Sequence, residues 1–146
     1  MSAISDYLEN KIIDWLLRGQ TFTPPTTVYV GLLTAAPSDA GGGTEVSGGS
    51  YARVAVASSL SNWAGSQSAG STAASTGTGG TTSNNAAVTF PAPTANWGAV
   101  THFGVYDASA AGNLLFYAAL TTPKTINNGD AAPSFAAGAL TFQIDN

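Results

Sequence analysis

The chain has 146 residues, the size of one ordinary domain, and we expect a single structural domain over residues 1–146. It has no cysteine, so disulfides and thiolate metal sites are excluded. Its four basic residues are scattered, which argues against nucleic-acid binding, and no apolar run approaches the ~20 residues that span a membrane.

The low charge is the most unusual feature of the composition. Charged residues make up 8% of the chain, against roughly 25% in an average protein. A free monomer usually keeps a charged surface, whereas the cores of protein interfaces are depleted in charge. We therefore expect a homo-oligomer, the alternative being a secreted Ser/Thr/Gly-rich β-domain. No secretory signal is evident at the N-terminus, so we expect a protein kept in the cytoplasm until it assembles.

The first segment is predicted to be a helix over about residues 3–18. Ile4, Leu8, Ile12 and Leu16 recur every four residues with Trp15 beside them, which makes one apolar stripe. That stripe packs either on the sheet of its own chain or on a neighbouring subunit.

Both ends of this helix carry recognisable signals. Ser2 or Ser5 can cap its start, and Gly19 is a plausible stop. Asp14 and Arg18 lie one turn apart and are expected to pair weakly on the wet face.

Beyond Pro24 and Pro25, which end the helical region, short apolar or alternating segments predict β-strands. The predicted strands are Thr26–Leu33, Tyr51–Ala57, Ala87–Phe90, Ala99–Asp107, Leu114–Leu120 and Ala139–Ile144. Their number and spacing indicate a mainly β fold, an antiparallel β-sandwich of jelly-roll-like type over about residues 26–146, with one N-terminal α-helix.

Two low-complexity stretches interrupt these strands, at residues 35–49 and at about 64–86. The second consists almost wholly of Ser, Gly, Thr, Ala and Asn, a composition that cannot bury a core of its own. We expect a long exposed loop there, either mobile or ordered against a neighbour.

We find no catalytic signature. His102 is the single histidine and is expected to be a partly buried strand residue without a catalytic or metal role. No Gly-x-Ser-x-Gly elbow and no phosphate-binding Gly-rich loop occurs. The carboxylates show no short-spaced acid–base pair among Asp39, Glu45, Asp107, Asp130 and Asp145. We therefore expect no enzyme and no cofactor.

Two weaker ligand sites were considered. Asp39, Glu45 and Asp130 offer oxygens to a calcium ion, but nothing in the sequence fixes their geometry. A sugar-binding platform is the other, although aromatics on the strands of a sandwich are more often core. Its aromatic members would be Trp63, Trp97, Tyr29, Tyr51 and Tyr106.

Several ordered segments together resemble the small structural proteins of tailed-bacteriophage virions, described as tail-fibre-like or as capsid accessories. The segments cover most of the chain apart from the long loop, and they are Tyr7–Lys11, Val28–Leu33, Glu45–Arg53, Val88–Pro91, Trp97–Asp107, Gly112–Phe116 and Phe135–Leu140.

The resemblance implies a non-enzymatic virion component. Its compact single domain favours an oligomeric capsid decoration or cement protein, a trimer by first expectation, that contacts the major capsid protein. The alternatives are a tail or fibre component that contacts other tail proteins, and a non-viral carbohydrate-binding β-sandwich.

Overall fold

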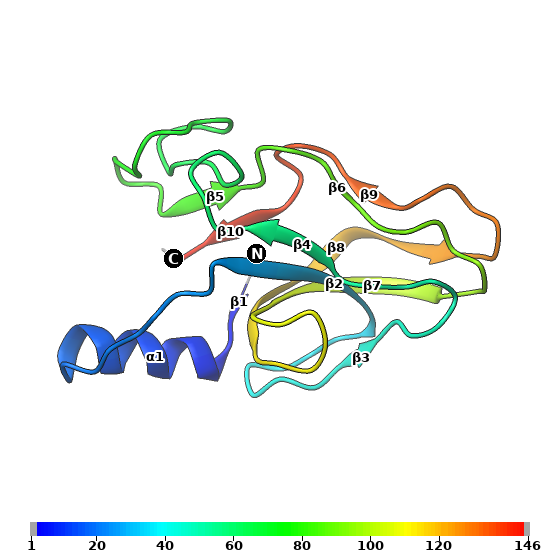
Figure 1. Ribbon diagram of the computed structural model, residues 1–146, viewed down its shortest axis with the longest axis horizontal. Coiled ribbons are helices and arrows are strands. Elements are labelled where there is room, and N and C mark those ends of the chain that lie inside the picture. Colours follow the sequence, from blue (N-terminus) through cyan, green and yellow to red (C-terminus); the bar gives the residue numbers. More distant parts are fainter. Residues whose placement is uncertain (1–2, 145–146) are drawn as a thin grey trace.

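The computed structural model describes residues 3–144 and is mainly β, with antiparallel sheets and one helix near the N-terminus, which confirms the predicted fold class (Figure 1). In chain order the elements are β1 (Ala3–Ile4), α1 (Asp6–Leu17), β2 (Thr27–Ala35), β3 (Thr44–Glu45), β4 (Val54–Ala57), β5 (Thr81–Ser83), β6 (Val88–Thr89), β7 (Gly98–Tyr106), β8 (Leu114–Ile126), β9 (Ser134–Phe135) and β10 (Thr141–Gln143).

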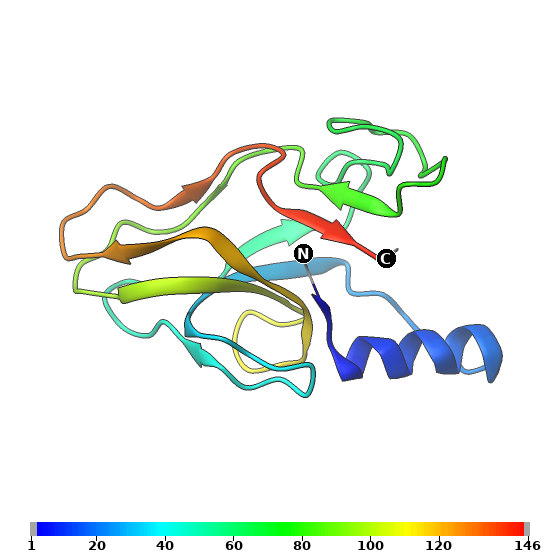
Figure 2. The same ribbon diagram turned by 180° about the vertical axis from the view of Figure 1, so that it is seen from behind.

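The main sheet has six strands in the order β1-β8-β7-β2-β3, with β4 also paired to β2. Two short ribbons, β5 with β10 and β6 with β9, form separate two-stranded sheets. Figures 1 and 2 show both ribbons along the same side of the main sheet. The second layer is therefore built from two ribbons and the segments that join them.

The core lies between the main sheet and these ribbons. Val30 on β2 and Phe103 on β7 are buried, and the ribbons contribute Phe135 and Phe142. The Phe103 ring centroid lies 5.5 Å from that of Phe135 and 5.9 Å from that of Phe142, both edge-on. Such contacts between layers stabilise the stack beyond simple area burial.

Strand β8 runs six residues past its predicted end at Leu120. Its extension contains Pro123, which is unusual in a strand interior. The β7–β8 register shifts between the pairs His102–Ala119 and Val100–Lys124, so Pro123 lies within an irregular stretch where ladder hydrogen bonds are already interrupted. A proline is tolerated there.

The helix begins later than predicted, because Ala3 and Ile4 pair with β8 as β1. Ser5 is the N-cap: its side chain accepts a hydrogen bond from Leu8 N and donates one to Leu114 O. The alternative cap, Ser2, lies outside the described residues. Gly19 follows the last turn with a φ of 67°, a conformation that glycine adopts without strain, and thereby ends the helix as predicted.

The apolar stripe of the helix packs on its own chain only at its start. Leu8 is buried, and Ile4 and Ile12 pack against the core. Trp15 is 57% exposed and Leu16 is 65% exposed, so at these two residues the stripe does not cover its own sheet, and packing on a neighbouring subunit stays a prediction. The reason is geometric, because the second half of α1 extends beyond the end of the sheet (Figures 1 and 2).

The predicted loop at 64–86 is shorter than expected. Residues 81–83 form β5 and pair with β10, in the register Thr82 to Phe142. Asn84 follows β5 and is 1% exposed. Its amide nitrogen donates to the carbonyls of Ala86 and Ala136, and its Oδ1 accepts from Leu140 N at 2.8 Å. Asn84 therefore anchors the end of the loop to the segment that leads into β10.

Candidate assembly surface

The carboxylates considered as calcium ligands lie in separate local contacts. Asp130 Oδ2 accepts from Asn127 N at 2.7 Å and closes a turn, whereas Asp39 accepts a hydrogen bond from the hydroxyl of Tyr117. Across residues 3–144, no group of three or more His, Cys, Asp or Glu side chains is placed to hold a metal ion. Asp145 lies outside that range.

His102 sits on β7 opposite Leu33 of β2 and Ala119 of β8. It is partly buried, as predicted, and its Nδ1 is 2.8 Å from the hydroxyl oxygen of Thr101, the preceding residue. A hydrogen bond between adjacent strand residues orients the ring, but it assembles no nucleophile with a base and a third orienting group.

Glu45 and Arg53 form the centre of a polar cluster beside β3. Arg53 Nε donates to Glu45 Oε1 at 2.8 Å and Nη2 donates to Oε2 at 2.7 Å, which is a bidentate pair. Arg53 Nη1 donates to the carbonyls of Ala108 and Ala111 at 2.8 Å each. The guanidinium therefore fastens the turn between β7 and β8 to β3.

Two tyrosines complete this cluster. The Tyr51 hydroxyl donates to Glu45 Oε1 at 2.8 Å and accepts from Leu32 N at 2.9 Å. The guanidinium carbon of Arg53 lies 3.5 Å from the Tyr106 ring centroid, a cation–π contact. Burial raises the pKa of Tyr51 well above its usual range, so its hydroxyl remains a donor. With its charges paired, the cluster works as a structural clamp.

A glycine makes room for the clamp. A Cβ on Gly31 would lie 3.0 Å from Glu45 Oε1 and 3.1 Å from the Tyr51 hydroxyl. Sequence reasoning missed the clamp, although Glu45 and Arg53 are the first and last residues of one of the segments that resemble virion proteins. The available signal was the rarity of charge in this chain, because an isolated arginine near an isolated glutamate has few other partners.

The two tryptophans do not share a platform. Trp97 is 5% exposed, donates from Nε1 to Gly49 O at 2.9 Å, and meets the Tyr51 ring edge-on at 5.3 Å. Its assignment to the core is confirmed. Trp63 is partly buried, and its ring lies 5.7 Å from Phe142 in a different part of the molecule.

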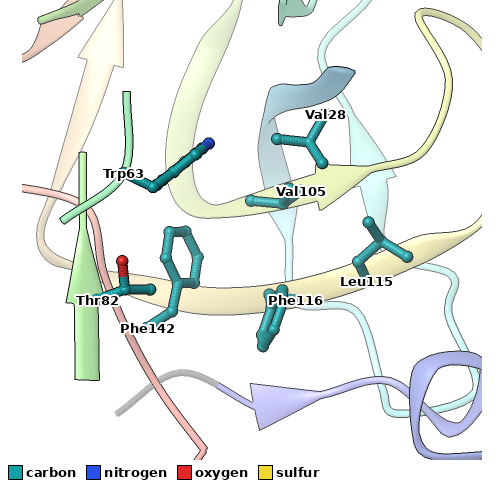
Figure 3. Close-up of a pocket in the computed structure, with 7 residues that line it drawn as sticks. All are labelled: Val28, Trp63, Thr82, Val105, Leu115, Phe116 and Phe142. Carbon is teal, nitrogen blue, oxygen red and sulfur yellow. The ribbon is translucent and has the colours of Figure 1, made fainter. Parts of the chain in front are cut away.

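Trp63 lines an apolar cavity of about 180 Å³ beside the start of β2. We call it the aromatic cavity, and its lining residues are Val28, Trp63, Thr82, Val105, Leu115, Phe116 and Phe142. Figure 3 shows Trp63, Phe116 and Phe142 coming from three different segments, with the Phe142 ring pointing toward Trp63 and with Val28 and Val105 across from them. No charged residue lines it. Its chemistry suits an apolar side chain or ring.

The second apolar surface is the C-terminal half of α1, which we call the helix end. Its members are large and exposed by 48% to 77%: Ile13, Trp15, Leu16 and Leu17. Asp14 is the charged residue within it and pairs with Arg18 at 2.8 Å, as the sequence predicted. Exposed apolar patches of this kind mark interaction sites.

No helix within the described part of the chain is both long enough and apolar enough to cross a membrane.

A family model described as "Podophage GP4 fiber I protein gp80" matches residues 3–143, which is nearly the whole chain. No curated protein matches the sequence.

Proposed function

This chain belongs to the podophage fibre protein family that its residues 3–143 match, and we propose that it serves as a subunit of an oligomeric tail fibre. Membership of the family makes it a structural component of a phage virion. The match over nearly the whole chain is the observation that carries the proposal, and it favours the fibre over a capsid decoration or cement role.

The proposed fibre subunit acts by assembly with copies of itself, with a trimer as the expected order. Three features support this. Charged residues are 8% of the chain, the helix end leaves four large apolar side chains in water, and the aromatic cavity opens an apolar site to a neighbour. Apolar surface of this extent is stabilised by burial in an interface.

A sugar-binding role has weaker support. Trp97 is buried in the core, and Trp63 faces the aromatic cavity, so the aromatic side chains present no joint flat surface to a saccharide. The clamp residues Glu45 and Arg53 satisfy each other and have little capacity left for a ligand.

Electron microscopy of purified virions tests the fibre proposal directly. Gold-labelled antibodies raised against the purified chain are expected to decorate the tail. Labels spread over the head would support the capsid decoration role and overturn the fibre proposal. Antibodies adsorbed beforehand with the purified chain are the control.

A further inference from the structure

The helix end is apolar on nearly all sides. Residues 12–17 read Ile-Ile-Asp-Trp-Leu-Leu, and successive residues of a helix point about 100° apart. Ile13, Leu16 and Leu17 share one face, while Trp15 continues the face that Leu8 begins. A helix that is apolar all round is normally buried. Because this one extends beyond its own sheet, its large apolar side chains are exposed and available to another surface (Figures 1 and 2).

The aromatic cavity has the opposite shape and the same chemistry. Its volume of about 180 Å³ compares with the roughly 150 Å³ apolar cavity that accepts a benzene ring. It is therefore large enough for one bulky apolar side chain. Its rings come from β8, β10 and the segment after β4, so its shape is fixed by the core itself (Figure 3).

We propose that the helix end of one copy docks into the aromatic cavity of a second copy, with Leu17 as the inserting side chain and Leu16 packed beside it at the rim. This rests on the proposed oligomeric function and names its interface. The occupant is a second copy because one chain carries both the projecting and the receiving surface.

The charges agree with this pairing. The cavity lining holds no charged side chain, and the helix end has its single charged member, Asp14, neutralised by Arg18. Docking would therefore bury no unpaired charge. Burial of an unpaired charge is the cost that usually prevents such contacts. A strongly acidic or basic partner would gain nothing from either surface.

The contact joins two different surfaces, so it is head-to-tail. Each copy donates one helix end and receives another, and the contacts close into a ring when the rotation between copies permits. Every subunit then buries two patches, one against each of its two neighbours. A three-membered ring suits the trimer proposed above.

Disulfide trapping tests the proposal, because the chain has no native cysteine. Leu17→Cys and Thr82→Cys are made as separate variants, then oxidised alone and as an equal mixture. We expect a covalent dimer in the mixture and monomers in each variant alone. Leu60→Cys mixed with Thr82→Cys is the matched control, since Leu60 is 56% exposed but belongs to neither surface.

Two outcomes of this experiment overturn the proposal. A dimer in the Leu17→Cys sample alone means that helices meet each other symmetrically, and no dimer beyond the Leu60→Cys control means that the two surfaces do not meet. The double variant Leu17→Cys/Thr82→Cys is expected to give a closed covalent ring whose mass reports the number of subunits.

Sedimentation velocity supplies a second readout without cysteines. Leu16→Ser/Leu17→Ser removes the inserting side chain together with its neighbour at the rim, and Val28→Phe fills the cavity, while Leu60→Ser is the control. We expect each of the first two variants to be monomeric, their mixture to form a one-to-one dimer, and the control to match the wild type.

Two results of sedimentation velocity contradict the proposal. One is a Val28→Phe variant that keeps its melting temperature and still associates as the wild type does. The other is a wild type that is monomeric at tens of micromolar. The gold-labelling experiment does not depend on the interface, so it tests the fibre proposal independently of these results.

Discussion

At the scale of single residues, some of the few charged side chains hold turns together, as Arg53 does between β7 and β8. The side chain of Arg53 is 6% exposed and that of Arg18 is 70% exposed, although each forms an ion pair with a nearby carboxylate. An exposed pair contributes little because water and salt screen it, whereas breaking a buried pair leaves an uncompensated charge and unpaired carbonyls. The two arginines therefore allow a matched comparison.

Arg53→Ala is expected to lower the free energy of unfolding by about 3–5 kcal/mol, because Glu45 and the carbonyls of Ala108 and Ala111 lose their donor. Arg18→Ala is expected to cost less than about 1 kcal/mol. Urea denaturation followed by circular dichroism measures both. Equal costs for the two variants would show that the clamp does not stabilise the fold.

Alkaline pH should weaken the fold through Tyr117. The hydrogen bond to Asp39, with a smaller contribution from burial, raises the pKa of Tyr117 to about 12, above the value of about 10 expected in the unfolded chain. The stabilisation is complete below pH 10 and declines as the pH rises from 10 toward 12, because the unfolded state releases its proton first. Denaturation midpoints across this range should fall less steeply in Tyr117→Phe than in the wild type. Parallel curves would exclude the linkage.

At the scale of elements, α1 divides into a half that belongs to the fold and a half that does not. Leu8 is 7% exposed and packs in the core, whereas Leu17 is 77% exposed. Leu8→Ala should cost about 2–5 kcal/mol and Leu17→Ala less than about 0.5 kcal/mol, measured at concentrations low enough for monomers to dominate. A costly Leu17→Ala under these conditions would mean that the helix end packs on its own chain.

The long loop depends on one side chain at its end. Asn84 makes three hydrogen bonds from a buried position, one of which satisfies the backbone N–H of Leu140. Asn84→Ala should lower the free energy of unfolding by about 1–3 kcal/mol, because buried polar groups lose their partner. The exposed Asn128→Ala serves as the control in thermal denaturation. Indistinguishable melting temperatures would show that the loop is held by other contacts.

Apolar periodicity predicted the elements that carry apolar side chains. Phe103 and Val105 on β7, and the alternation around Phe142 on β10, revealed strands that the structure contains. The strand β5 was missed because Thr81, Thr82 and Ser83 carry no apolar residue, and its pairing with β10 depends on a contact distant in sequence. Local patterns identify a segment that can be buried but do not identify its partner.

The same limit applied to the candidate site. The helix stripe was evident from the spacing of Leu8, Ile12 and Leu16. Spacing shows which face of a helix is apolar, but it does not show how much of that face the sheet of the same chain covers. The aromatic cavity is lined by Trp63 and Phe142, which lie far apart in the sequence, so no local sequence motif could predict it. Both surfaces become visible only when the fold places them.

At the scale of the whole molecule, the described residues form a two-layered β fold from which the apolar second half of α1 projects (Figure 1). The clamp at Glu45 fixes the turns at the β3 edge, and the ribbons close the core on one face. Low charge removes the repulsion that would keep copies apart. These properties suit a structural component of a phage virion.

The central claim is that this protein is a tail-fibre subunit, and its copy number in purified virions tests that claim most directly. Quantitative mass spectrometry against the major capsid protein of the same particles gives the number. A fibre subunit is expected at a handful to a few tens of copies per particle, in a multiple of the oligomeric order. Hundreds of copies, in a fixed ratio to the capsid protein, would contradict the account and place the protein on the capsid surface.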